Sequence, residues 1–134
     1  MMKALRVLVI EDDALVAMLL ADVLAGMGHQ VCAVAATEAE AITAATRHAP
    51  DLMIADAGLG QGSGVSAVEE ILRAGPIAHV FVSGDAGRVR ARKPGAVVVR
   101  KPFRQAELAK AIDTALGAAA LHRPEKLSNS GDCY

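Results

Sequence analysis

The chain has 134 residues, the usual size of a single domain, and 53% of them are hydrophobic, which is enough to build a core. The formal net charge is −1, so no field of the whole chain draws it to nucleic acid or to a membrane surface. Its two cysteines, Cys32 and Cys133, are too few for a disulfide framework. The N-terminal residues lack the pattern of a signal peptide, and no apolar run is long enough to span a bilayer. We therefore expect a cytoplasmic protein that binds neither nucleic acid nor membrane directly.

The first part of the chain alternates short apolar runs with a helical pattern. Residues 6–10 (RVLVI) are rich in β-branched side chains and predict a buried strand. Residues 13–28 predict a helix that ends at Gly28 as a C-cap, and residues 30–36 (QVCAVAA) predict a second strand. The apolar residues at helical spacing in this helix are Leu15, Leu19, Val23 and Met27.

The next segment begins with a helix start signal. Thr37 and Glu40 form the capping-box pattern T-x-x-E, which predicts a helix over 37–47. Residues 52–55 (LMIA) predict a third strand. Residues 65–75 then predict a helix, because their apolar side chains fall on one helical face.

The last part of the chain repeats the alternation. Residues 79–83 (HVFVS) and 97–99 (VVV) predict the fourth and fifth strands. Between them, residues 84–96 are only weakly helical, because glycines interrupt the pattern. Residues 104–122 predict a final helix.

Five predicted strands that alternate with helices indicate an α/β fold. Because the strands are almost continuously apolar, both faces of the sheet should be covered, which favours a parallel sheet. Right-handed crossovers then give a doubly wound sheet with helices on both faces. We assign this domain to residues 1–121, and a polar tail that is disordered or loosely packed to residues 122–134.

Polar side chains follow four of the predicted strands, at the points where these strands end. In a doubly wound fold the carboxyl ends of the strands share one edge, where functional groups gather. These residues are Glu11, Asp12 and Asp13 after the first strand, Asp56 after the third, Ser83 after the fourth and Lys101 after the fifth. We expect Asp13 to cap the following helix and the other five to meet at this edge.

Carboxylates that meet at one edge predict a particular chemistry. They repel one another strongly unless a cation lies among them, and oxygen ligands with room for water suit Mg²⁺. Lys101 adds a positive charge and Ser83 a hydroxyl group. This set favours phosphoryl transfer, with Asp56 as the nucleophile that forms an acyl phosphate.

Four glycines after Asp56 suggest a second interpretation, a loop that binds phosphate directly. They occupy every second position, at Gly58, Gly60, Gly62 and Gly64. The dinucleotide pattern G-x-G-x-x-G fails at Ser63, and the Lys-Ser or Lys-Thr of a P-loop is missing. We therefore interpret these glycines as a flexible connection from strand to helix, with a phosphate cradle as the alternative.

Four segments resemble the receiver domain of bacterial two-component response regulators. They are VLVIEDDALVAMLLADVL with its acidic pair, LMIADAGL with Asp56, VFVSGD with Ser83 and VVRKPF with Lys101. The last is quite specific, because the Lys-Pro peptide of this family is usually cis. The resemblance covers about residues 5–120 and implies a flavodoxin-like sheet with the strand order 2-1-3-4-5.

The resemblance implies a stand-alone, single-domain response regulator rather than an enzyme. In that family, the residue matching Asp56 accepts a phosphoryl group from a phosphohistidine on a sensor histidine kinase or a histidine phosphotransfer protein. The phosphorylated domain then signals through protein–protein interaction. The segments VFVSGD and LGQGSG look most like small receivers with an F-x-S-G motif and like the receiver half of stress-response anti-sigma regulators.

The resemblance also implies how the polar residues share the work. Asp12 and Asp56 bind Mg²⁺ through their side chains, Gly58 binds it through its carbonyl group, and Glu11 assists through water. The residues that contact the phosphoryl group are Ser83 and Lys101.

The chain departs from the family at three places. Val98 stands where the family usually has an aromatic switch residue, so activation by rotation of a ring cannot be carried over. Residues 57–60 read AGLG, where many members have a methionine-proline turn. The helical pattern of the predicted fourth helix is weak. This segment also contains a basic cluster, formed by Arg88, Arg90, Arg92 and Lys93. We interpret this cluster as a solvated face, with a surface for an acidic partner as the alternative.

Two other functions remain open at this point. One is a degenerate receiver that binds partners without phosphorylation, although the intact acids, hydroxyl and lysine argue against it. The other is a phosphohydrolase with an Asp nucleophile. Such enzymes usually need a second Asp two residues after the first, and here that position is Gly58.

Overall fold

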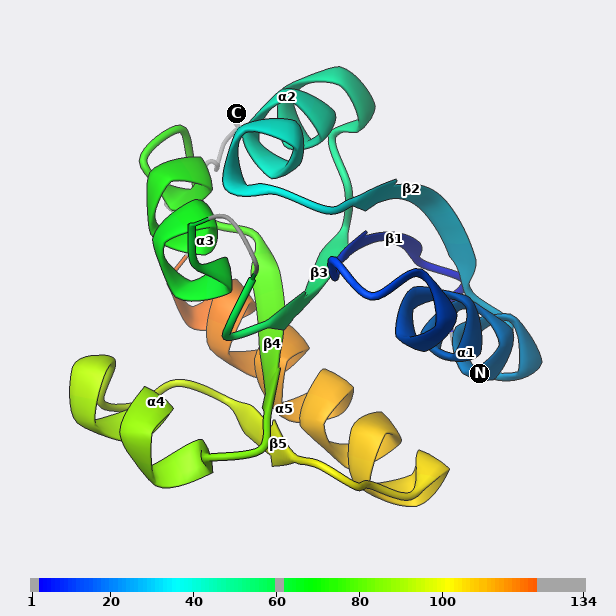
Figure 1. Cartoon of the computed structure of the whole chain (residues 1–134). Helices are drawn as coiled ribbons and strands as arrows, with labels where there is room; N and C mark the ends of the chain where they lie inside the picture. The colour runs from blue at the N-terminus through cyan, green and yellow to red at the C-terminus, as the bar shows by residue number, and fades with distance from the viewer. Residues whose placement is uncertain (1–2, 60–61, 123–134) are drawn as a thin grey trace, which may run out of the picture.

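The computed structural model describes residues 3–59 and 62–122. Within these residues, five parallel strands lie in the order β2-β1-β3-β4-β5 and alternate along the chain with five helices (Figure 1). The strands are β1 (Arg6–Ile10), β2 (Gln30–Ala35), β3 (Leu52–Asp56), β4 (Ala78–Ser83) and β5 (Val98–Arg100). The helices are α1 (Ala14–Gly26), α2 (Glu38–His48), α3 (Gly64–Leu72), α4 (Ala86–Arg92) and α5 (Gln105–His122). The predicted α/β fold, its flavodoxin-like strand order and the parallel sheet are confirmed.

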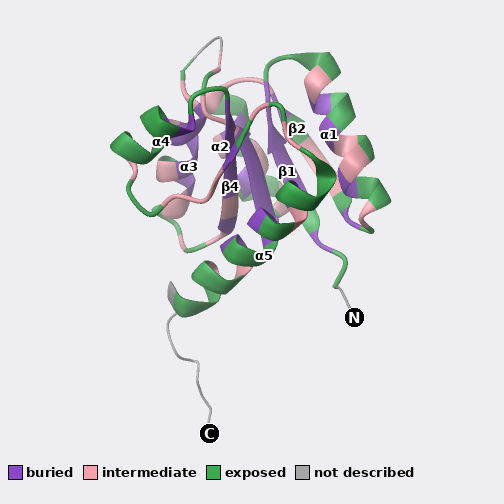
Figure 2. Cartoon of the chain, turned by 90° about the horizontal axis from the view of Figure 1, so that it is seen from below, coloured by how far each residue is buried: buried purple, intermediate pink, exposed green. Residues whose placement is uncertain are grey.

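Alternating side chains of the central strands build two core layers. On β1, Val7 and Val9 pack with α1 and α5, whereas Leu8 and Ile10 pack with α2, α3 and Val89 of α4. The ribbon shows the same division, with α1 and α5 on one face of the sheet and the other helices on the opposite face (Figure 1). Figure 2 shows the buried residues on the strands and on the helix faces turned toward them. Both faces are covered, as the apolar strands predict.

Two predicted helix starts are confirmed in atomic detail. The Asp13 carboxylate accepts hydrogen bonds from the backbone N–H groups of Leu15 and Val16, at 2.9 and 3.2 Å, and so caps α1. Thr37 Oγ1 accepts from the Glu40 N–H group at 3.1 Å, which caps α2. These bonds satisfy donors that the first turn of a helix leaves without a partner.

The buried face of α1 is not the one that its leucine spacing suggests. The helix buries Ala17, Leu20 and Leu24. Leu15 and Leu19, in contrast, are 64% and 55% exposed. Because α1 is apolar on nearly every side, periodicity indicates a helix but cannot select its inner face.

The weakest predicted element does form a helix. The short helix α4 begins at a cap in which the Asp85 carboxylate accepts the Arg88 N–H group at 3.1 Å, and Val89 packs into the core. The tail predicted for 122–134 lies outside the described residues, apart from His122 at the end of α5. No helix in 3–59 or 62–122 combines the length and apolarity needed to cross a membrane.

Candidate functional site

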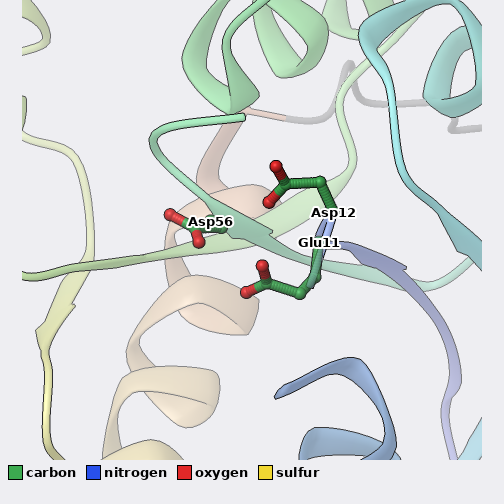
Figure 3. Close-up of side chains that lie close together, drawn as sticks. All are labelled: Glu11, Asp12 and Asp56. Atoms are coloured by element: carbon green, nitrogen blue, oxygen red, sulfur yellow. The ribbon is translucent and has the colours of Figure 1, made fainter. Parts of the chain in front are cut away.

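Three carboxylates meet where β1 and β3 end. Glu11 and Asp12 directly follow β1, and Asp56 is the last residue of the neighbouring strand β3. One carboxylate oxygen from each residue lies within 4.8 Å of the others (Figure 3). The structure therefore brings together three of the acids that the sequence placed at one sheet edge.

The Lys101 ammonium, which follows β5, reaches this acidic cluster at the same edge of the sheet. Its Nζ lies 3.0 Å from Asp56 Oδ2 and 3.8 Å from Glu11 Oε1. The backbone N–H of Lys101 donates to the Ser83 carbonyl at 2.8 Å, and the peptide that joins Lys101 to Pro102 is cis. Lys101 thus compensates part of the negative charge, and it does so in a partly buried position.

Glu11 is the buried member of the cluster. Its side chain is only 2% exposed, and burial, aided by the nearby Asp56 carboxylate, raises the pKa of Glu11 from 4.5 to about 7. The Asp13 N–H donates to Oε2 at 3.1 Å and opposes this shift, while Oε1 is buried without a hydrogen-bond partner among the described residues. An oxygen of this kind is ready to accept a proton, a water molecule or a cation.

The donor set of the acidic cluster fits Mg²⁺. Hard carboxylate oxygens at short mutual distance are the ligands this ion takes in proteins, and a cation among them removes their repulsion. Within the described residues, the unsatisfied Oε1 of Glu11 is an oxygen that the water shell of such an ion could contact.

Ser83 lies at the same edge, at the end of β4. It is 9% exposed, and its neighbour Val82 pairs with Asp56 in the sheet. The Ser83 hydroxyl accepts the Asp85 N–H at 2.9 Å, at the residue that caps α4. The hydroxyl therefore links the edge of the sheet to the start of α4.

The loop after Asp56 uses its backbone donors within the protein. Gly58 N–H donates to Asp56 Oδ1 at 3.0 Å, and Gly64 N–H donates to the Ala57 carbonyl at 3.2 Å. Ser63 Oγ caps α3 by accepting from Val65 and Ser66, at 3.1 and 3.4 Å. A phosphate cradle would need such groups free, so the described part of this loop favours a structural connection.

One of these glycines has a steric role that the sequence did not reveal. A Cβ atom at Gly64 would lie 1.8 Å from the Asp56 carbonyl oxygen, so the first turn of α3 packs directly on the backbone of Asp56. Nothing lies within 4 Å of a Cβ built at Gly58. Gly60 lies outside the described residues.

The sequence also gave no sign of a cavity beside the acidic cluster. This cavity, of about 400 Å³, has Gly58 and Ser83 in its wall together with Arg88 and Arg92 of α4. Those two arginines belong to the basic cluster that the sequence suggested was a solvated face. The loop after β3 and α4 both contribute residues to the wall of this cavity, and this arrangement places the two arginines there.

Comparison with known proteins agrees with this geometry. The family model for the response regulator receiver domain matches residues 7–113. The phyllosphere-induced regulator PhyR of Methylorubrum extorquens is 35% identical over 117 residues, which are 84% of this chain and 44% of that protein. The transcriptional regulatory protein PdtaR of Mycobacterium tuberculosis is 36% identical over 115 residues, 83% of this chain and 56% of the relative. The chain thus spans about half the length of these relatives.

A solved structure and a shorter relative give the same result. The receiver domain of Erythrobacter litoralis PhyR superposes with a TM-score of 0.78 at 32% identity, over 85% of this chain and 91% of that domain. The chemotaxis protein CheY of Thermotoga maritima is 28% identical over 81% of this chain and 94% of its own length. On the family match, the strand order and the cluster of Glu11, Asp12 and Asp56, the chain belongs to the response regulator receiver domain family.

Proposed function

We propose that this chain is a response regulator receiver whose Asp56 accepts a phosphoryl group. The donor is a phosphohistidine on a sensor histidine kinase or a histidine phosphotransfer protein, and the reaction depends on Mg²⁺. The observation that carries this proposal is the position of the Asp56 carboxylate, between the acids that follow β1 and the Lys101 ammonium at 3.0 Å. The domain is a signalling phospho-acceptor and not an enzyme with a separate substrate.

The proposed transfer needs a nucleophile and compensation of charge. An Asp56 carboxylate oxygen forms a bond to phosphorus while the nitrogen–phosphorus bond breaks, and the electron pair returns to the imidazole ring of the donor. Lys101 attracts the phosphoryl oxygens, and the Ser83 hydroxyl donates a hydrogen bond to one of them. The Mg²⁺ ion supplies further positive charge at these oxygens. Its ligands would be the carboxylates of Asp12 and Asp56, the Gly58 carbonyl and, through water, Glu11.

The surface beside the acidic cluster supports a protein as the phosphoryl donor. Leu15, Met18 and Leu19 of α1 are 64%, 61% and 55% exposed. They lie close to the acidic cluster, because α1 begins only two residues after Asp12. Large apolar side chains that gather on a surface mark a site of protein contact. A partner that presents its phosphohistidine to Asp56 would cover this part of α1.

A protein is also the better candidate for the downstream target. The PhyR of Bartonella quintana, at 29% identity and a TM-score of 0.77, is an anti-anti-sigma factor. The near-neutral chain carries no charge excess that would draw it to nucleic acid. We therefore propose that phosphorylation regulates the binding of another protein in the cytoplasm.

The two alternative functions have less support. A phosphohydrolase of the Asp type would need an acid two residues after Asp56, and Gly58 offers none. A degenerate receiver that works without phosphate would have no use for the pairing of Lys101 with Asp56 across the strand that separates them.

Mass spectrometry tests the proposal directly. With Mg²⁺ and acetyl phosphate, the protein should gain the mass of one phosphoryl group, and Asp56→Asn should abolish the gain. Asp113→Asn, at an exposed position on α5, is the matched control and should be labelled like the wild type. Labelling that persists in Asp56→Asn would refute the assignment of the acceptor.

A further inference from the structure

The cavity beside the acidic cluster joins two functional regions of the molecule. It measures about 400 Å³, and its wall contains Ala57 and Gly58 after β3 and Ser83 at the end of β4. The same wall contains Arg88 and Arg92 of α4. The remaining lining residues are Ser63, Val65, Asp85 and Val89. Since Gly58 and Ser83 also belong to the proposed acceptor site, this cavity adjoins it.

The charged groups around this cavity are not equally engaged. Arg92 Nη2 already donates to Ser66 Oγ at 2.8 Å and to Glu69 Oε1 at 3.2 Å. The Asp85 carboxylate is used as the cap of α4. The Arg88 side chain, in contrast, makes no hydrogen bond or ion pair within residues 3–59 and 62–122. The cavity wall therefore contains one guanidinium group whose charge is not matched by a protein carboxylate.

A phosphoryl group on Asp56 would create a need for such a charge. It carries roughly two negative charges and three acceptor oxygens, whereas the unmodified carboxylate carries one charge. Glu11 and Asp12 lie on the β1 side and contribute negative charge, and Lys101 supplies a single ammonium. Besides Lys101 and the proposed Mg²⁺ ion, Arg88 and Arg92 place positive charge on the α4 side of the proposed site.

Gly58, two residues after Asp56, adds no side chain to the cavity wall. A Cβ built at this glycine would meet nothing within 4 Å, so the space next to it is open. An arginine side chain is long and ends in a planar fork that can bind two phosphoryl oxygens at once.

We infer that Arg88 is a further phosphoryl-binding residue of this receiver, and that its guanidinium pairs through this cavity with the phosphoryl oxygens on Asp56. The inference rests on the proposed phosphorylation of Asp56. Arg88, a member of the basic cluster, would then have a binding partner, the phosphoryl group, that is present only after Asp56 is phosphorylated. It also gives α4 a direct contact with the phosphoryl group, in addition to the hydrogen bond between Ser83 and the capping residue Asp85.

This contact would replace a function for which the chain lacks the usual aromatic residue. Val98 is too small to act as the aromatic residue that links phosphorylation to conformation in related receivers. Arg88 lies one turn after the cap of α4, so a pull on its side chain acts on the whole of this seven-residue helix. The salt bridges of Arg92 and Lys93 to Glu69, at 3.2 and 3.9 Å, are partly exposed and weak enough to adjust.

Binding of beryllofluoride, a mimic of the phosphoryl group, tests this inference in the presence of Mg²⁺. Arg88→Ala and Arg88→Gln should weaken beryllofluoride binding by about five- to tenfold, the range for loss of one partly exposed charge-assisted hydrogen bond. Arg90→Ala is the matched control, because Arg90 is exposed on the same helix and does not line the cavity. It should bind as tightly as the wild type. The Arg88 side-chain N–H resonance should also shift in the wild type when beryllofluoride is added.

The outcomes separate this inference from the proposed function. If the wild type neither binds beryllofluoride nor gains a phosphoryl group, both proposals fall. If it does both, but the Arg88 variants bind like Arg90→Ala and the Arg88 resonance does not move, only the role of Arg88 is refuted. Because the Arg88 side chain has no hydrogen-bond or ion-pair partner among the described residues of the unmodified protein, its loss should leave the melting temperature unchanged, which checks that the variants fold.

Discussion

Replacement of Gly64 by alanine should damage both the fold and the proposed acceptor. The new Cβ would lie 1.8 Å from the Asp56 carbonyl oxygen, and real Cβ atoms essentially never approach another heavy atom within 3.0 Å. The start of α3 and the end of β3 must therefore separate by more than 1 Å. Because both partners are backbone in a packed region, we expect a loss of about 2–3 kcal/mol in the free energy of unfolding.

The displacement should also slow the proposed phosphorylation of Asp56. Asp56 would carry its carboxylate away from Lys101, and a misplacement of about 1 Å can slow a positioned reaction by about a hundredfold. We therefore expect Gly64→Ala to slow labelling by acetyl phosphate even under conditions where the protein remains folded.

Urea unfolding followed by circular dichroism measures the change in stability, since the chain has no tryptophan to serve as a fluorescent probe. Gly117→Ala is a matched control within α5, where an added Cβ meets nothing within 4 Å. An alanine there should stabilise the protein by about 0.5–1 kcal/mol, because it lowers the entropy of the unfolded chain. If the free energy of unfolding of Gly64→Ala lies within about 0.5 kcal/mol of the wild-type value, the predicted clash between a Cβ at position 64 and the Asp56 carbonyl is refuted.

Two further substitutions test the acceptor site, and a third tests a partly buried histidine near the start of β4. Asp12→Ala removes one of the two carboxylates proposed to hold Mg²⁺, so the magnesium affinity measured by calorimetry should fall by about a hundredfold, or about 2.7 kcal/mol; an unchanged affinity would contradict a shared site. Ser83→Ala should still accept phosphate on Asp56, but the change in amide exchange that phosphorylation causes over residues 84–100 should shrink to the part that the proposed Arg88 contact transmits, and a change that persists in full would refute the coupling through Ser83. His79 is held neutral because burial lowers its pKa below 6.5, so the wild type should lose stability as the pH falls below that value, and His79→Gln should lose less. Equal slopes for the two proteins between about pH 7.5 and pH 5 would show that His79 does not contribute.

The sequence predicted the fold and the acidic cluster because both depend on local patterns that one fold collects. Continuous apolar strands, the cap at Asp13 and the capping box at Thr37 each specify a short element, and a parallel sheet has only one edge where its strands end. The meeting of Asp12, Asp56 and Lys101 follows from that topology. No distant contact had to be guessed to predict it.

What the sequence did not reveal depends on packing between elements. The close approach of Gly64 to Asp56 requires the angle at which α3 meets β3, and glycine spacing alone cannot supply that angle. The cavity at Arg88 requires the position of α4, whose own pattern is weak. The exposed face of α1 could not be read from a helix that is apolar on nearly every side, because only its neighbours decide which leucines are covered.

The strand order of the sheet has a consequence for the order of events during synthesis. The strand that ends at Asp56 pairs with β1 and β4, and the lysine that faces Asp56 follows β5, the last strand of the sheet. Domains made of such distant pairings gain their contacts late, once most of the chain is available. A chain that is still emerging from the ribosome would lack Lys101 and therefore the charge that the acceptor needs. If Asp56 is the acceptor, only completely synthesised and folded chains could then be phosphorylated.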